Sequence, residues 1–188
     1  MAIFKSSPSA CLQDNCGKLI ISEEAGVYHA TNNTSGFGTP NIQGSDITEA
    51  IITVTWPSGA DEDYDVTSQI PSTVTGTIEF NAIEGDFPDG IYSIKTTYTT
   101  SSQVYTKTIK VLMLCHACCC VDKMWAKLPE KYYSLSDEQY AIETRNVMLA
   151  SSLLSSLKGA GSCNKQSLVD DMLERIQRLC DFQNCNCQ

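Results

Sequence analysis

The stretch DGIYSIKTTY, residues 89–98, decides the fold of this chain. An Asp-Gly turn signal leads into alternation, in which Tyr92, Ile94 and Tyr98 share one face of an extended segment. A period of two is typical of a strand that buries one face. The stretch therefore predicts a half-buried β-strand over Gly90–Thr99.

The same period extends outward over residues 18–114. Asp46–Trp56 and Val74–Phe80 alternate, and further strands are predicted at Lys18–Ser22, near Tyr64–Thr67 and at Gln103–Leu114. Short strands without intervening helices are typical of an antiparallel sandwich or barrel. We expect seven residues inside an antiparallel β-sandwich domain over residues 1–114: Ile52, Val54, Trp56, Ile78, Phe80, Tyr92 and Ile94.

Tyr92 adds a second signal, because it comes directly after the turn at Asp89-Gly90. This arrangement resembles the tyrosine corner of immunoglobulin-like sandwiches, in which the hydroxyl hydrogen-bonds to nearby backbone. An ordinary turn with a half-buried aromatic residue explains the same pattern, and both interpretations stay open. The usual pair of bridging cysteines is absent, so any relationship to immunoglobulin domains is architectural.

The hydrophobic period becomes helical after Cys115. A first helix is predicted to stop at Pro129, a second to begin at a capping box of Ser136 and Gln139, and a third to run over Asn164–Cys180. The predicted apolar stripes are Cys118, Val121, Trp125 and Leu128; then Tyr140, Val147, Ala150, Leu154 and Leu157; then Leu168, Met172, Ile176 and Leu179. The fold class is therefore α+β, with a small three-helix, Cys-rich region over residues 115–188.

Eight of the ten cysteines lie in this helical region. The first eight residues contain no apolar stretch long enough for a signal peptide, so we expect synthesis in a reducing cytosol. We therefore predict reduced thiols that are mostly buried, because free Cys behaves as a small apolar residue. A structural metal site and disulfides are the alternatives.

A zinc site has one candidate set of ligands. Helices that run up, down and up would bring Cys118–Cys120 and Cys163 to one end, and Cys180 to the other. Cys115, Cys118, Cys120 and Cys163 would then form the four-thiolate group that zinc prefers. Only Cys115 and Cys118 have the spacing of a metal knuckle, so we predict no cofactor, with structural zinc as the alternative.

Catalytic signals are weak. His116 borders the cysteine run, but no acid or Asn is placed in the sequence to orient it, and His29 lies in a predicted strand. We predict no catalytic residues and no enzyme activity, with a thiol-dependent enzyme using Cys118–Cys120 and His116 as the alternative. Asp61–Asp65 imitates the start of a calcium loop, but it lacks the required glycine and closing Glu, so we expect a solvated acidic turn.

The composition argues against two classes of partner. The net charge is -9 and the 13 Lys and Arg residues are scattered, whereas binding of nucleic-acid phosphates needs clustered positive charge. No segment is apolar enough to cross a membrane.

The order of these features is similar to that of a known family. A Thr- and Val-rich antiparallel domain, the run Cys-Cys-Cys-Val-Asp-Lys within Cys115–Lys123, and short helices with a Cys-rich tail resemble neck and tail ring proteins of crAss-like podoviruses, which are tailed phages of gut Bacteroidota. The resemblance implies a virion structural protein that is assembled in the host bacterial cytoplasm. It also implies a cyclic homo-oligomer below the portal that forms part of the DNA channel or its sheath, in contact with the portal and other neck and tail proteins.

Two physical arguments agree with such a ring. Edge strands of an open sandwich can supply the head-to-tail contacts that a ring needs. An acidic surface lets genomic DNA pass nearby without specific binding, because tight binding would need positive charge. The alternative function from another class is a cytosolic zinc-binding adaptor with a Cys-rich helical module.

Overall fold

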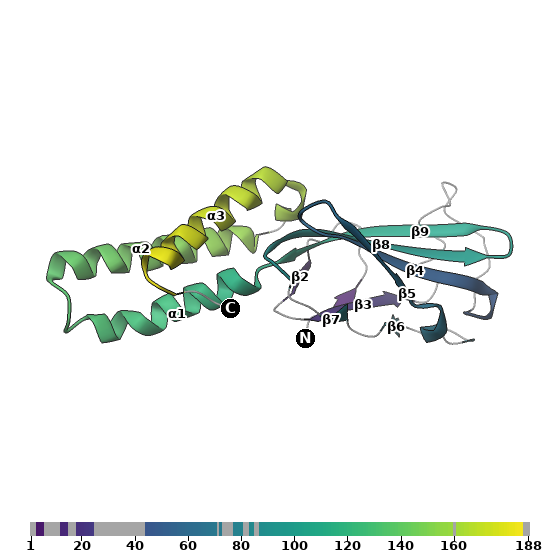
Figure 1. Cartoon of the computed structure of the whole chain (residues 1–188), viewed down its shortest axis with the longest axis horizontal. Helices are drawn as coiled ribbons and strands as arrows, with labels where there is room; N and C mark the ends of the chain where they lie inside the picture. Colours follow the sequence, from purple (N-terminus) through teal and green to yellow (C-terminus); the bar gives the residue numbers. More distant parts are fainter. Residues whose placement is uncertain are drawn as a thin grey trace.

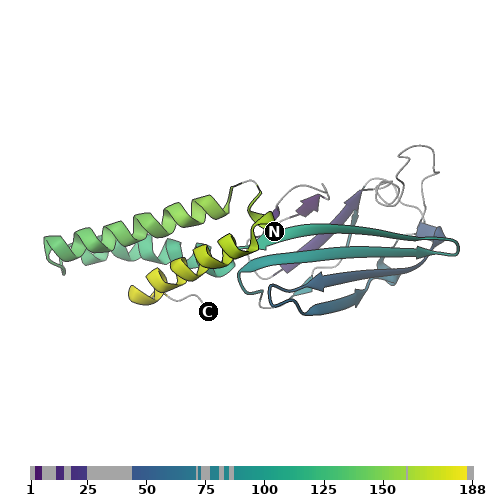
Figure 2. The same cartoon turned by 90° about the horizontal axis from the view of Figure 1, so that it is seen from above.

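The computed structural model describes residues 3–5, 12–14, 18–24, 44–70, 72, 77–80, 83–84, 87–159 and 161–185. The chain has an α+β fold in which an antiparallel sheet is followed by three helices, as predicted. Figures 1 and 2 show the helices and the β part placed end to end, so the described body is elongated.

The described strands and helices follow one another in two blocks, strands first. The strands are β1 (Ile3–Lys5), β2 (Leu12–Asp14), β3 (Lys18–Glu24), β4 (Ile47–Thr55), β5 (Asp61–Asp65), β6 (Thr77–Glu79), β7 (Ile83–Glu84), β8 (Gly90–Thr100) and β9 (Val104–Met113). The helices are α1 (Cys115–Lys131), α2 (Asp137–Leu157) and α3 (Gln166–Phe182). The predicted boundary between strands and helices thus falls where β9 ends and α1 begins.

The larger sheet has the strand order β2-β9-β8-β4-β5. β8 is its central strand, because it pairs antiparallel with β4 on one side and with β9 on the other. β2 pairs parallel with β9, and β5 is the opposite edge. A smaller group of strands, β1-β3-β6 with β7 beside β3, lies beneath the larger sheet in Figure 1.

The alternation in the sequence correctly predicts the buried face of the larger sheet. Ala50, Ile52 and Val54 of β4 are buried, as are Tyr92 and Ile94 of β8. Phe80 is also buried, whereas Trp56 is only partly buried against this core. The side chain of Ile78 lies outside the described residues.

The acidic run Asp61–Asp65 differs from its prediction. It forms the edge strand β5, paired with β4, rather than a turn. The predicted strand near Tyr64–Thr67 is therefore shifted toward the N-terminus. Pairing with β4 fixes the backbone of this run, while its carboxylates stay in water at the sheet edge.

Tertiary packing rotates the buried stripes of α1 and α3 relative to the predicted ones. In α1, Met124 is buried in place of Trp125, which is 46% exposed. In α3, Val169 is buried in place of Leu168. Ile91, Leu112 and Leu114 belong to the same hydrophobic cluster as the helices, so the ends of β8 and β9 help to select these faces.

The helix ends follow the local signals more closely. The capping box of α2 is confirmed: Gln139 N donates to Ser136 Oγ, and Ser136 N donates to Gln139 Oε1. The predicted buried residues Val147, Ala150, Leu154 and Leu157 of α2 are also confirmed. Pro129 lies in the last turn of α1, which ends two residues later at Lys131, so the predicted stop is slightly early.

Candidate functional site at the sheet–helix junction and the cysteine cluster

The start of β8 holds the tyrosine corner that the sequence suggested. Tyr92 is fully buried, and its hydroxyl donates a hydrogen bond of 2.7 Å to the carbonyl oxygen of Pro88. The rings of Trp56 and Phe87 pack on it, with centroids 5.5 and 5.8 Å from that of Tyr92. The corner fixes the chain just before it reaches the helices.

Gly90 is required at this corner. Its φ of +151° favours glycine, and an added Cβ would lie 2.7 Å from the Cγ of Pro57. The close approach of Pro57 and the positive φ together explain why Asp89 is followed by glycine.

Asp89 connects the corner to α1. Its Oδ1 accepts a hydrogen bond of 2.9 Å from the backbone N–H of His116, and its Oδ2 accepts one of 2.6 Å from that of Ala117. A helix leaves its first N–H groups without partners, and Leu114 at the cap position has no side chain that could accept them. The β part therefore supplies the cap of α1 from a residue far away in sequence.

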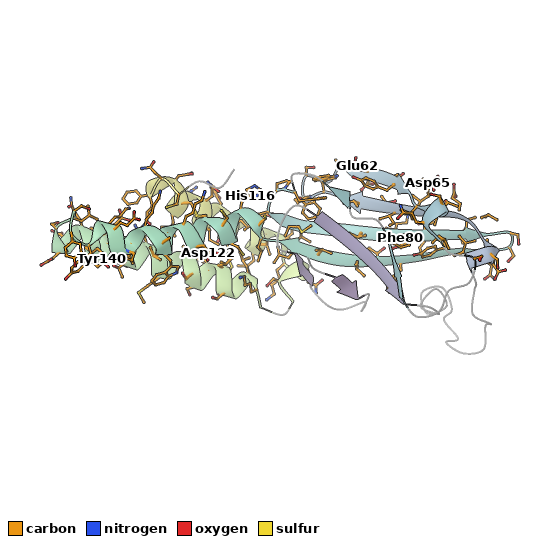
Figure 3. All side chains as sticks on the ribbon, turned by 90° about the horizontal axis from the view of Figure 1, so that it is seen from below. Glu62, Asp65, Phe80, His116, Asp122 and Tyr140 are labelled. Carbon is orange, nitrogen blue, oxygen red and sulfur yellow. A yellow bond between two sulfur atoms is a disulfide. The ribbon has the colours of Figure 1, made fainter. Side chains whose placement is uncertain are left out.

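His116 lies at this junction (Figure 3). Its Nδ1 is 3.6 Å from Asp89 Oδ1, so the fold brings to His116 an acid that the sequence did not place beside it. Both residues line a cavity of about 540 Å³, together with Glu174, Arg178 and Asp181. Burial raises the pKa of Asp89, opposed by its hydrogen bonds with His116 and Ala117. Since both carboxylate oxygens accept backbone N–H groups, the geometry assigns Asp89 a structural task.

One disulfide joins α1 to α3. Cys120 and Cys180 are 60 residues apart in sequence, and their Cα atoms are 6.0 Å apart. The expectation that Cys180 lies at the far end of the helices is wrong, because α3 begins over the ends of β8 and β9 and is offset along α1 (Figure 1). Its last turn thereby reaches only the first part of α1.

The other described cysteines divide into two groups. Cys115, Cys119 and Cys163 also take part in disulfides, whereas Cys118 and Cys185 are free thiols. The prediction of reduced thiols is therefore wrong for five described cysteines. The prediction was inferred from the expected reducing cytosol. Which cysteines form disulfides depends instead on the distances between them, and the packing of the helices sets these distances. Cys11, Cys16, Cys187 and His29 lie outside the described residues.

The four-thiolate group that was the alternative to a metal-free chain is not assembled in the described part of the chain. Of its members, Cys115, Cys120 and Cys163 are in disulfides, and Cys118 is a free thiol. A sulfur in a disulfide is not the thiolate that zinc binds. Among the described residues, no three His, Cys, Asp or Glu side chains are grouped as metal ligands would be.

Cys118 is half-buried beside an open cavity of about 650 Å³ that Lys158 also lines. Burial raises the pKa of the Cys118 thiol, and the charge and hydrogen bond of Lys158 lower it only in part. A catalytic cysteine needs a lowered pKa, because the thiolate is the nucleophile. This environment therefore keeps the Cys118 thiol protonated at neutral pH.

Sequence reasoning missed Asp89, Lys158 and the partner of Cys120. The Asp-Gly pair was recognised as a turn, but nothing in the sequence connects it to the start of α1, 27 residues later. An uncapped helix start at Leu114 was the available signal, since it requires an acceptor from elsewhere.

Comparisons with known proteins give no relatives: no family model, no curated protein and no solved structure matches this chain. In the part of the chain that the structure describes, no helix is both long enough and apolar enough to span a bilayer.

Proposed function

We propose that this chain is a structural subunit of a larger assembly. The observation that carries the proposal is the joining of its two parts into one elongated body. A hydrophobic cluster runs from Ile91 and Leu112 into all three helices, Asp89 caps α1, and a disulfide links Cys120 to Cys180. The cluster and the cap connect the two parts, and the disulfide fixes α3 on α1 within the helical part. Together these connections suit a part that must keep its shape while neighbours bind to both of its ends.

The β part is, in this proposal, an immunoglobulin-like sandwich. The order β9-β8-β4-β5 corresponds to the G, F, C and C′ strands of that fold, with the tyrosine corner at the start of the F-like strand β8. The strands β1, β3 and β6 would supply the second sheet. Sandwiches of this type serve in many unrelated proteins, so this assignment concerns architecture and does not specify the function.

The specific assembly that we propose is a cyclic homo-oligomeric ring in the neck or tail of a tailed phage. This proposal is motivated by a resemblance to crAss-like ring proteins, which involves the segment Cys115–Lys123 and its flanking elements. Disulfides persist at virion surfaces but are rare in a reducing cytosol, so the disulfide-linked helices favour a final location in the released particle. The net charge of -9 is compatible with DNA passing the ring without being bound.

The acidic strand β5 restricts how such a ring would form. Four of its five residues are acidic, and Asp61, Glu62 and Asp63 are exposed at the sheet edge. Charged side chains on an edge strand prevent pairing with another strand. The head-to-tail contact of the ring therefore has to use surfaces other than the β5 edge.

Purified particles of the phage that encodes the chain give the test. Mass spectrometry should detect this polypeptide at a constant stoichiometry to the portal, and a map of the intact particle should place it below the portal. A host-protein contaminant, unlike a ring subunit, would be lost on further gradient purification. Absence of the polypeptide from purified particles would end the virion proposal.

The zinc-binding adaptor is not favoured, because disulfides occupy three of the four proposed ligands. The thiol-dependent enzyme is not favoured either. Burial raises the pKa of the Cys118 thiol, and the other two cysteines of the run, Cys119 and Cys120, are in disulfides.

A further inference from the structure

The outer side of α2 and α3 carries a groove of about 480 Å³. The two helices run side by side over α1 (Figure 2), and Gln183 at the end of α3 donates to the carbonyl oxygen of Glu143 near the start of α2. Leu149, Leu153 and Leu179 form the apolar part of the groove, and charged residues of α3 form one wall.

Apolar exposure extends from this groove along both helices. Ile142 and Leu149 of α2 are each 49% exposed, and Phe182 at the end of α3 is 64% exposed. Single exposed apolar side chains are ordinary, but several on two helices that share an apolar groove favour a surface that binds a protein.

The exposed charges on α3 indicate which kind of protein this surface would bind. Asp171, Glu174, Arg175 and Arg178 are all exposed, and their spacing places them on one face of the helix. The two acids precede the two bases. An antiparallel copy of α3, related by a two-fold axis between Glu174 and Arg175, presents the bases first. Asp171 then faces Arg178 of the copy, and Glu174 faces Arg175 of the copy.

We propose that the α2–α3 groove binds a second copy of this chain through antiparallel packing of α3 on α3. The charge pattern is its own complement under a two-fold rotation, which is the symmetry of most homodimers. The exposed apolar residues Ile142, Leu149 and Phe182 flank the charged pairs and become covered. The contact is isologous, so it is separate from the head-to-tail contact of a ring and does not depend on the phage assignment.

Within one chain, the same charges form exposed i,i+4 pairs. Arg175 Nε is 3.0 Å from Asp171 Oδ2, and Arg178 pairs with Glu174. A test must therefore separate pairing within a helix from pairing between copies. Exchanging the charges at positions 171 and 178 does so. The doubly exchanged variant has like charges at i,i+4 within each helix, while opposite charges still face each other between copies.

The experiment is sedimentation equilibrium of the full chain with its disulfides intact, at concentrations up to the order of 100 µM. The wild type should form a species of twice the 20.6 kDa chain mass. Asp171→Arg should raise the dissociation constant by about tenfold or more, because the new side chain faces Arg178 of the copy and the two-fold symmetry repeats this repulsion. The double variant Asp171→Arg/Arg178→Asp should recover most of the affinity, although its melting temperature stays below that of the wild type.

Asp170→Arg is the matched control. It makes the same charge change one residue earlier, about 100° around the helix from Asp171, and so beside the row of charges that face each other across the contact. Its dissociation constant should stay within about twofold of the wild-type value. Leu149→Glu tests the apolar flank and should give a monomer with an unchanged circular dichroism spectrum.

Three outcomes overturn the proposal. The first is a wild type that stays monomeric over the whole concentration range. The second is a dimer that Asp170→Arg weakens as much as Asp171→Arg does. The third is a double variant that dimerises no better than Asp171→Arg alone, which would assign these charges to pairing within the helix.

Discussion

The β part and the helical part of this molecule select their buried residues by different rules. In β4 and β8, side chains point alternately to two faces, so one buried residue fixes the orientation of all the others. In α1 and α3, the apolar stripe is wide, and neighbouring positions such as Trp125 and Met124 compete for the core. The difference explains why the strand faces could be predicted and the helix faces only approximately.

The two parts are also held together differently. Side chains of the larger sheet, together with Phe80 and Phe87 from outside its strands, fill the described core of the β part. The helical part depends in addition on a covalent link between α1 and α3 and on a cap that the β part donates. If this contrast is correct, truncation of a buried side chain should be the most destabilising change in the β part. Loss of the disulfide or of the cap should be the most destabilising change in the helical part.

Phe80→Ala should have the largest effect. The side chain is 3% exposed, so its loss should lower the free energy of unfolding by roughly 3–5 kcal/mol. Val104→Ala removes an exposed side chain from the same part and should change it by less than about 0.5 kcal/mol. Urea melts measure both. A loss under about 1 kcal/mol for Phe80→Ala would place this residue at the surface.

Cys120→Ala/Cys180→Ala should come next. A link that spans 60 residues restricts the unfolded chain, and the typical loss on removing such a disulfide is about 2–4 kcal/mol. The matched control is Cys118→Ala, which removes a free thiol from the same helix. Equal melting curves of the double variant and the wild type without reductant would contradict a stabilising role for the link.

Asp89→Ala should destabilise by about 1–2 kcal/mol, because the N–H groups of His116 and Ala117 lose their acceptor. Asp89→Asn keeps one oxygen acceptor and should lose less. Asp122→Ala removes an exposed acid from α1, the helix that Asp89 caps, and serves as the control. Chemical denaturation at neutral pH gives the free energy of unfolding of all three variants. If Asp89→Ala lowered it no more than Asp122→Ala does, the cap would not stabilise the chain.

The titration of Asp89 should also be visible in the pH dependence of stability. Burial raises the pKa of this carboxyl in the folded chain above its ordinary value of about 4. In the window between the two values the unfolded chain binds fewer protons, so the stability that Asp89 contributes falls as the pH rises. The free energy of unfolding of the wild type relative to Asp89→Asn should therefore decrease from about pH 4 upward. A difference that increases with pH would mean that the backbone N–H groups lower the pKa instead.

Tyr92→Phe should have the smallest effect of the series. It removes only the hydroxyl that donates to Pro88, and loss of one such hydrogen bond costs about 1 kcal/mol. The control is Tyr133→Phe, because Tyr133 is 92% exposed at the far end of the helices. If both variants melt at the wild-type temperature, the tyrosine corner is a feature of geometry without a measurable contribution to stability.

The sequence by itself determined those features that adjacent residues decide. Alternation in Gly90–Thr99 predicted β8 and its buried face, and Ser136 with Gln139 predicted the start of α2, because backbone geometry and capping act over a few residues. It also suggested the tyrosine corner, whose hydrogen bond spans only four residues.

Only the tertiary structure decided the junction and the cysteines. The cap that Asp89 provides and the link between Cys120 and Cys180 join residues 27 and 60 positions apart. The offset of α3 along α1 selects the partner of Cys120, and the ends of β8 and β9 help to set that offset by packing against the helices. Local propensities carry no information about such an offset, because it follows from the fit between surfaces that meet only after the chain has folded.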